Sequence, residues 1–387
     1  MITNTKIKYC KKCIMPSTKP DLEFNSNGIC SGCIAFEQRD KINWEERSKK
    51  FIEILNTYKN NNNNNYNCIV PCSGGKDSHY QVLKLLELGM NPLCVNASTD
   101  KLSELGRYNL DNIKKLGVDL IEINTDKILR RKINKFTLET IGDISWAEHL
   151  TIFTIPVKVT LWMKIPLIIW GENSQNENGG PIEKQNAINL DRRWLEEFGG
   201  LLGLRVSDII NILNIPEEKM SLYKYPTDEE LKKNKINGLF LGQFYPWDGV
   251  SNYELAKKNG FKEYYKDLEG TIVRYENLDN LQMRVHDYFK YLKYGYDRVT
   301  DWCCWNIRRG RQKREEALKI NFEKSGKFPS TYMEVKLEEI LKEIECSKEE
   351  FASICDKFTN KKIFKCNNDG NVIKKPDGSL LINNLDN

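Results

Sequence analysis

Hydrophobic residues in the middle of the chain recur with two different spacings. Short apolar runs of strand length occur at residues 68–72, 92–97, 118–123, 166–170 and 238–244. The segments between them have helical periodicity; residues 77–88, for example, carry Val82, Leu85 and Leu86 before a stop at Gly89. Strands that alternate with helices predict an α/β fold, in which a parallel sheet is covered by helices on both faces.

The two ends of the chain show other patterns. Residues 1–40 hold four Cys and little apolar periodicity, and residues 44–58 predict a short charged helix. Helical stretches are also predicted up to residue 164, with breaks near Gly142 and Pro156. Further helices are predicted at about residues 251–259, 277–293, 310–324, 334–345 and 347–358. We therefore divide the chain into an N-terminal unit at 1–45, an α/β domain at 46–300 and a mostly helical C-terminal region at 301–387.

Composition narrows the class of protein. The 387 residues are 40% apolar, which suffices for a full core, and the 59 Lys and Arg exceed the 54 Asp and Glu by only five. Such a mild excess does not demand nucleic acid, and we expect no nucleic-acid partner. No run of 18 apolar residues occurs, so we expect no membrane span. The polar first residues predict no signal peptide, and we expect a cytoplasmic protein whose twelve Cys are reduced.

Four of these Cys form two C-x2-C pairs. Cys10 and Cys13 are followed, after 16 residues, by Cys30 and Cys33. This is the spacing of a structural zinc site, in which two tight turns supply four thiolates at the corners of a tetrahedron. With four protein ligands the shell is closed, so we expect a zinc ribbon that plays no part in catalysis. Unliganded thiols or a redox pair are the alternatives.

A glycine-rich turn directly follows the first predicted strand. Its sequence is Ser73-Gly74-Gly75-Lys76-Asp77-Ser78, and a helix is predicted to begin at once. The first turn of a helix has unpaired N–H groups and a partial positive charge, so it holds anions. Gly74 and Gly75 permit close backbone approach, and the hydroxyls of Ser73 and Ser78 can bond to phosphate oxygens.

Two charged residues of this turn have less obvious roles. Lys76 adds positive charge for phosphate if it points inward. Asp77 is expected either to hold Mg²⁺ or to cap the helix. The kinase-type P-loop is absent, because Lys76 is followed by Asp77 rather than by Ser or Thr.

The string resembles the S-G-G-x-D-S motif of the PP-loop, or N-type, ATP pyrophosphatases. That resemblance implies a HUP-like parallel α/β fold and an enzyme that uses ATP. In this class ATP is cleaved between its α and β phosphates and AMP is placed on a carbonyl oxygen. A nitrogen or sulfur nucleophile then displaces AMP, while the loop binds the departing pyrophosphate.

Two groups of this class combine a zinc ribbon with the loop, namely tRNA thiolation enzymes and N-acetyl sugar amidotransferases. The chain resembles the second group over nearly its whole length, in segments Cys10–Pro20, Trp170–Asn173, Phe244–Asp248, His286–Tyr296, Ile307–Arg311 and Arg314–Ala317. It is therefore identified as similar to enzymes of surface-polysaccharide, O-antigen and nonulosonic acid biosynthesis. A thiolation enzyme is the alternative, although the sequence lacks the further C-x2-C zinc module that some of those enzymes carry near the C-terminus. A noncatalytic nucleotide-binding protein is less favoured, because the loop is intact.

The resemblance implies that an acetamido group of a sugar becomes an acetamidino group. ATP with Mg²⁺ would adenylate the acetamido oxygen, and ammonia would displace AMP, as in an AMP- and pyrophosphate-forming ligase. Position 2 is Ile rather than Cys, and no Gly-flanked Cys elbow with a downstream His occurs. We therefore expect a separate glutaminase subunit to supply the ammonia.

Further site residues are expected after the later strands, because ligands of parallel sheets bind at the carboxyl ends of strands. Glu172 can bind Mg²⁺ or orient ammonia, or else it is a solvated turn carboxylate. Asn173 and Asp248 are candidates for substrate binding. Arg192 and Arg308 can hold a substrate phosphate or carboxylate, or else they lie on a solvated basic surface. His79 and His286 are interpreted as structural.

Overall fold

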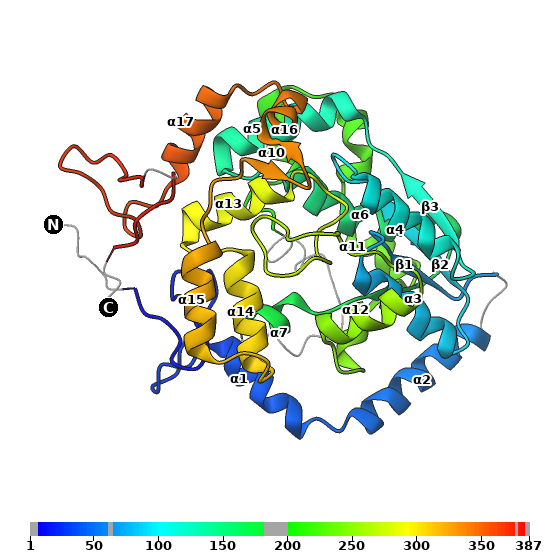
Figure 1. Ribbon diagram of the computed structural model, residues 1–387. Coiled ribbons are helices and arrows are strands. Elements are labelled where there is room, and N and C mark those ends of the chain that lie inside the picture. The colour runs from blue at the N-terminus through cyan, green and yellow to red at the C-terminus, as the bar shows by residue number, and fades with distance from the viewer. Residues whose placement is uncertain (1–6, 61–64, 182–199, 376–377, 384–387) are drawn as a thin grey trace.

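The core of the molecule is a parallel β-sheet. The computed structural model describes residues 7–60, 65–181, 200–375 and 378–383, and within these residues five parallel strands form one sheet in the order β3-β2-β1-β4-β5 (Figure 1). The strands are β1 Cys68–Pro71, β2 Pro92–Ala97, β3 Asp119–Ile123, β4 Leu167–Trp170 and β5 Asn237–Phe240. The predicted fold class is confirmed. The order reverses beside β1, so a crevice for ligands is expected between the carboxyl ends of β1 and β4.

Helices cover both faces of this sheet. Cys68 and Val70 pack against one layer, which consists of α2 (Trp44–Asn60), α3 (Lys76–Glu87) and α4 (Glu104–Lys114). Ile69 faces the other way, toward α6 (Trp146–Met163). Alternate residues of a strand point to opposite faces, and β1 is buried on both, which explains its uninterrupted apolar sequence.

The helices on the second face differ from the prediction at one point. Helix α5 (Lys127–Ile141) ends as predicted, at Gly142 in the left-handed conformation. Helix α6, however, continues through Pro156 without a break, so the break predicted there is wrong. Proline in a helix interior costs about 3 kcal/mol. Burial of the neighbouring Ile155 and Val157 in the apolar cluster against the sheet offsets that cost.

The described residues between β4 and β5 add no strand to the sheet and include several short helices. These are α7 (Ser174–Asn178), α10 (Val206–Leu213), a 3-10 helix at Glu217–Tyr223 and α11 (Asp228–Lys233). Strand β5 stops at Phe240, earlier than the predicted residue 244, because a 3-10 turn at Leu241–Gln243 follows it. Helix α12 (Gly249–Lys258) then packs against α3.

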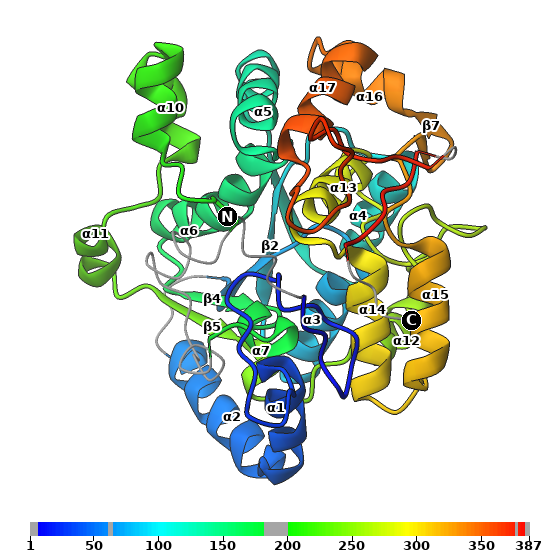
Figure 2. The same ribbon diagram turned by 90° about the vertical axis from the view of Figure 1, so that its left-hand side faces the viewer.

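The C-terminal region is mostly helical, as predicted. Its elements are α13 Met283–Tyr294, α14 Arg298–Arg308, α15 Arg314–Lys324, the hairpin β6 Thr331–Tyr332 and β7 Val335–Lys336, α16 Leu337–Glu343, and α17 Lys348–Phe358. The sequence prediction missed α14. Figures 1 and 2 show α14 and α15 beside the N-terminal segment, where Val299 and Ala317 share an apolar cluster with Cys10 and Cys33. The domain boundaries at residues 45 and 300 stay a prediction.

The described residues contain no helix that is both long enough and apolar enough to cross a bilayer.

Candidate active site

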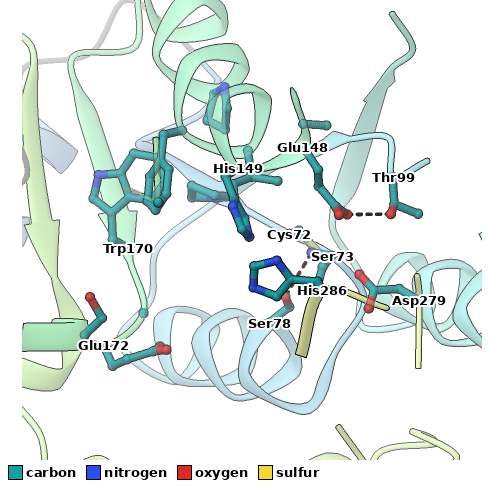
Figure 3. A pocket seen from close by; sticks show the side chains of 18 of the residues that line it. Cys72, Ser73, Ser78, Thr99, Glu148, His149, Trp170, Glu172, Asp279 and His286 are labelled. Carbon is teal, nitrogen blue, oxygen red and sulfur yellow. Dashed lines mark hydrogen bonds between the residues drawn. The ribbon is translucent and has the colours of Figure 1, made fainter. Parts of the chain in front are cut away.

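A cavity of about 900 Å³ opens at the carboxyl ends of the strands. Its floor includes Cys72 after β1, Asn96 in β2, Trp170 at the end of β4 and Phe240 at the end of β5. Helices α6 and α13 form part of its wall, and Figure 3 shows His149 and His286, which they contribute. The cavity therefore occupies the crevice that the reversal of strand order predicts.

The glycine-rich turn between β1 and α3 lies at the edge of this cavity. The backbone N–H of Ser73 donates to Ser78 Oγ at 3.1 Å, and the N–H of Gly75 donates to Ser73 Oγ at 3.2 Å. Gly74 has φ +85, and a Cβ there would lie 2.7 Å from the Cα of Leu110 in α4. The turn is thus closed on itself and pressed against α4, with Ser73 and Ser78 on the cavity wall.

Two predicted residues of the turn are directed elsewhere. Lys76 is 4% exposed, and its Nζ lies 2.6 Å from Asp77 Oδ2 and 2.6 Å from Glu276 Oε1. Burial alone would lower the pKa of Lys76, but the carboxylates of Asp77 and Glu276 raise it. Asp77 also accepts a hydrogen bond from Asn252 Nδ2 in α12 at 2.8 Å. Both side chains therefore join the turn to α12 and to the segment before α13, and their catalytic roles stay a prediction.

Carboxyl groups with raised pKa values line the cavity. Burial, followed by the charge of Asp77, raises the pKa of Glu172 to about 7. Glu172 lines the cavity, and its side chain is exposed to the space that a ligand would occupy. Burial also raises the pKa of Glu148 to about 7 and that of Asp279 to about 6. Raised carboxyl pKa values gathered in one cleft are typical of a functional site, and the oxygens of such groups are the ligands that Mg²⁺ prefers.

Other predicted site residues have structural contacts. Asn173 is 2% exposed, and its Oδ1 accepts from the N–H of Gln175 at 3.0 Å as the N-cap of α7. Asp248 caps α12 and accepts from Arg311 Nη1 at 2.9 Å, with Arg309 Nε at 3.1 Å. Neither Asn173 nor Asp248 is among the described residues that line the cavity.

The contacts with Arg311 and Arg309 lower the pKa of the Asp248 carboxyl group. Burial alone would raise its pKa, but Arg311 and Arg309 lower it to about 2. Substrate binding by Asn173 and Asp248 stays a prediction. Arg192 lies outside the described residues.

The four predicted metal ligands meet in a buried cluster. Cys10 Sγ lies 3.9 Å from Cys33 Sγ, and Cys13 Sγ lies 3.7 Å from Cys30 Sγ. Four thiolates at about 2.3 Å from a zinc ion have S···S separations of about 3.8 Å, whereas a disulfide needs about 2.05 Å. The four sulfur atoms lie within 4.8 Å of one another. Their geometry fits a single tetrahedral zinc ion.

Arg308 belongs to this cluster rather than to the cavity. Its Nη2 lies 3.8 Å from Cys30 Sγ and 4.0 Å from Cys13 Sγ, and its Nη1 donates to the carbonyl of Glu177 at 2.9 Å. Burial alone would lower the pKa of Arg308, but the thiols raise it. A buried guanidinium offsets the negative charge that four thiolates leave around one Zn²⁺. Substrate binding by Arg308 stays a prediction.

Two histidines on the cavity wall face one buried carboxylate, a group that was not predicted from the sequence. Asp143, in the turn between α5 and α6, lies 2.9 Å from the Nδ1 of His286 in α13 and 3.6 Å from the Nδ1 of His149 in α6. These residues are separated by up to 143 positions in the sequence. The only sequence signal was the presence of His at 149 and 286, which carries no information about their partner.

Residues 269–376 match the family model of the "LPS biosynthesis protein WbpG-like, C-terminal domain". The predicted resemblance to enzymes of surface-polysaccharide biosynthesis is confirmed for this part of the chain. A protein of Methanocaldococcus jannaschii named "Uncharacterized protein MJ1599" is 34% identical over 121 residues, which are 30% of this chain. The matched region spans only 43% of that relative.

Two solved structures are also similar to part of the chain. The NH3-dependent NAD synthetase from Campylobacter jejuni has a TM-score of 0.29 and 13% identity, covering 58% of this chain and 100% of its own. The NMN synthetase from Francisella tularensis has a TM-score of 0.27 and 11% identity, covering 58% of this chain and 99% of its own. Scores this low say nothing about what this chain binds.

Proposed function

We propose that the chain is an ATP-dependent amidotransferase that converts an acetamido group of a sugar into an acetamidino group. The observation that carries the proposal is the closed turn Ser73–Ser78, which joins a buried strand to a helix at the edge of the cavity. The match of residues 269–376 to a lipopolysaccharide biosynthesis domain supports a sugar as the substrate.

The turn is suited to the pyrophosphate end of ATP. The first N–H groups of α3 have no partners within the helix, and the helix dipole favours anions there. The hydroxyls of Ser73 and Ser78 reach the same side, since both residues line the cavity. The positive φ of Gly74 and its contact with α4 hold the turn in one conformation, so the donors are oriented before ATP arrives.

A divalent cation would reduce the repulsion between the phosphates and the cavity carboxyl groups. Glu172 is the residue that would hold Mg²⁺, because it follows β4 and its oxygens face the cavity beside the turn (Figure 3). Bound Mg²⁺ would supply charge neutralisation to the leaving pyrophosphate. It would also favour the ionised form of Glu172, whose pKa of about 7 leaves it partly protonated at neutral pH.

The reaction divides into two displacements. The acetamido oxygen attacks the α-phosphorus of ATP, its P–O bond forms, and pyrophosphate departs with the electron pair. The resulting imidate carbon has AMP as a good leaving group, which an amide oxygen is not. Ammonia then adds its lone pair to that carbon, and the C–O bond to AMP breaks, leaving the amidine on the sugar.

Ammonia would come from a separate glutaminase subunit. Eleven of the twelve cysteines are buried, and Cys366 is partly buried. Four of the buried ones form the predicted zinc site, which leaves them unsuited to act as a glutaminase nucleophile. The zinc ion would have a structural role, joining the N-terminal segment to α14 through the contact between Arg308 and the thiols.

The test is an assay with ATP, ammonium and a panel of acetamido sugars. We expect sugar-dependent release of pyrophosphate and a product in which NH replaces O, identified by mass spectrometry. Ser78→Ala should slow the reaction, whereas Ser48→Ala, on the exposed face of α2, serves as the matched control. Release of orthophosphate would contradict the proposal, and release of pyrophosphate that depends on tRNA would favour the thiolation alternative.

A further inference from the structure

Two imidazole rings meet on the cavity wall without a role in the reaction described above. His149 and His286 come from α6 and α13, and their ring centroids lie 4.8 Å apart at an interplanar angle of 81°. Their side chains are 20% and 22% exposed, and both line the cavity. Figure 3 shows the two rings between Glu172 and Glu148, beside the turn that carries Ser78.

Asp143 determines how these rings are oriented. It is 1% exposed, and its Oδ1 accepts from the N–H of Ser145 at 2.8 Å as well as lying 2.9 Å from His286 Nδ1. Its Oδ2 faces His149 Nδ1, and neither atom has a hydrogen-bond partner among the described residues. Because both Nδ1 atoms face Asp143, the Nε2 atom of each ring is the nitrogen that a molecule in the cavity can reach. A carboxylate that orients an imidazole in this way is the arrangement in which His works as a base.

The charges around the pair favour different protonation states for the two rings. Burial lowers the pKa of His286, and His149 lowers it further, against the opposing effect of Asp143. Burial also acts to lower the pKa of His149, but the nearby carboxylate of Asp143 raises it overall. Near neutral pH His286 is therefore the neutral ring and His149 the one that tends to hold a proton. The charged groups that act on the pair are Asp143, Asp100, Glu148 and Asp287. Lys290 interacts with Asp287, and Lys293 interacts with Asp143.

We propose that His286, oriented by Asp143 and paired with His149, accepts the proton that the attacking nitrogen loses when ammonia adds to the activated acetamido carbon. This inference rests on the proposed function and names the residue that handles the ammonia step. Its geometric basis is that both imidazoles line the same cavity as the turn. A base therefore lies in the cavity that must also hold the carbon attached to AMP.

The proton balance of that step shows what the pair does. When the lone pair of ammonia forms the new C–N bond, the added nitrogen carries a positive charge and a surplus proton. The lone pair of His286 Nε2 takes this proton, and the resulting imidazolium returns it to the sugar nitrogen. The C–O bond then breaks, AMP leaves with the electron pair, and the amidine keeps the proton. Without a base, the protonated adduct would expel ammonia and revert to the imidate.

The carboxyl groups of the cavity are less suited to this task. Glu148 already accepts hydrogen bonds from Thr99 Oγ1 and Asn280 Nδ2, one on each oxygen. Glu172 faces the turn and is proposed to hold Mg²⁺. The Nε2 atom of His286 is neutral and can accept a proton, and Asp143 fixes the orientation of the ring. The neighbouring His149 repels a second positive charge, which helps the protonated His286 to return the proton.

The experiment separates the two halves of the reaction. Sugar-dependent exchange of labelled pyrophosphate into ATP, measured without ammonium, reports the adenylation step. Amidine formation, measured with ammonium, reports the complete reaction. In His286→Asn, the side-chain amide replaces Nδ1 as donor to Asp143, but Nε2 is lost. We expect exchange to be retained and amidine formation to fall by about 10² to 10⁴-fold, the usual contribution of a general base. Added imidazole should restore part of the rate in His286→Ala.

The pH profile and a second variant complete the design. At a constant concentration of free ammonia and saturating Mg²⁺, amidine formation by the wild-type protein should decline as the pH falls and His286 becomes protonated, and this decline should be smaller in His286→Gln, whose amide cannot take up a proton. Equal loss of both activities in His286→Asn, or no rescue of His286→Ala by imidazole, would overturn the inference. A wild-type protein without any exchange would instead refute the proposed function, and the inference with it.

Discussion

Replacing Gly74 with Ala tests whether the turn before α3 is held by its contact with α4. The residue has φ +85, and a Cβ on it would lie 2.7 Å from both the Cα and the N of Leu110, which are backbone atoms of a helix. The left-handed conformation costs a residue with a Cβ about 1–2 kcal/mol. Forcing a carbon into a packed contact costs about 1–3 kcal/mol more.

Two other glycines provide matched controls. Gly117 has φ +89 but no atom within 4 Å of its added Cβ, so Gly117→Ala measures the backbone strain alone. Gly75 has φ −69, and its added Cβ would meet Ser73 Oγ at 3.3 Å, so Gly75→Ala measures a local contact without strain. The steric contribution at Gly74 is the difference between Gly74→Ala and Gly117→Ala.

The measurement is the melting temperature without nucleotide, followed by the affinity for ATP. For a chain of this length, 1 kcal/mol corresponds to a shift of about 1 °C if the chain unfolds as one unit. We expect a loss of about 1–2 °C for Gly117→Ala and about 2–5 °C for Gly74→Ala, with weakened ATP binding only in the second. Equal shifts in the two variants, with ATP affinity unchanged, would show that the turn is not pressed against α4.

Three further predictions follow from other contacts. Native mass spectrometry should find one zinc ion per chain, and this ion should be lost in Cys13→Ser. Chelator competition should show that zinc is held about 10-fold less tightly in Arg308→Met than in the control Arg311→Met. Lys76→Met removes the cation between Asp77 and Glu276 and leaves Glu276 with only the more distant Arg298, at 3.6 Å. Chemical denaturation without ATP should therefore show a loss of about 3–5 kcal/mol, whereas a lysine needed only for phosphate would give no loss. The pKa of Asp248 is lowered to about 2, so the stability that its charge contributes is complete above the ordinary carboxyl pKa and is lost as the pH falls toward 2. In Asp248→Asn, the melting temperature should therefore depend less on pH in that range. An unchanged slope would contradict the ion pairs with Arg309 and Arg311.

Local signals in the sequence were sufficient for the framework. Strand β2 was predicted with its observed bounds, because an unbroken apolar run between a turn and a polar segment has few alternatives. The turn before α3 and the two C-x2-C pairs were found in the same way, since their chemistry depends on residues only a few positions apart. Helix α14 escaped detection because its sequence is rich in aromatic and β-branched residues, which favour helices weakly. Its stability comes from packing and from the Asp297 cap, which accepts from the N–H of Val299 at 3.0 Å.

Long-range contacts decided which side chains share the cavity. The sequence by itself determined the parallel α/β architecture, the turn and the four thiols, because periodicity and short spacing act along the chain. Only the tertiary structure turned Lys76 toward Glu276, placed Arg308 on the thiols and brought His149 and His286 to one carboxylate. The direction of a side chain depends on the partners that folding places beside it, and those partners lie up to 295 positions away.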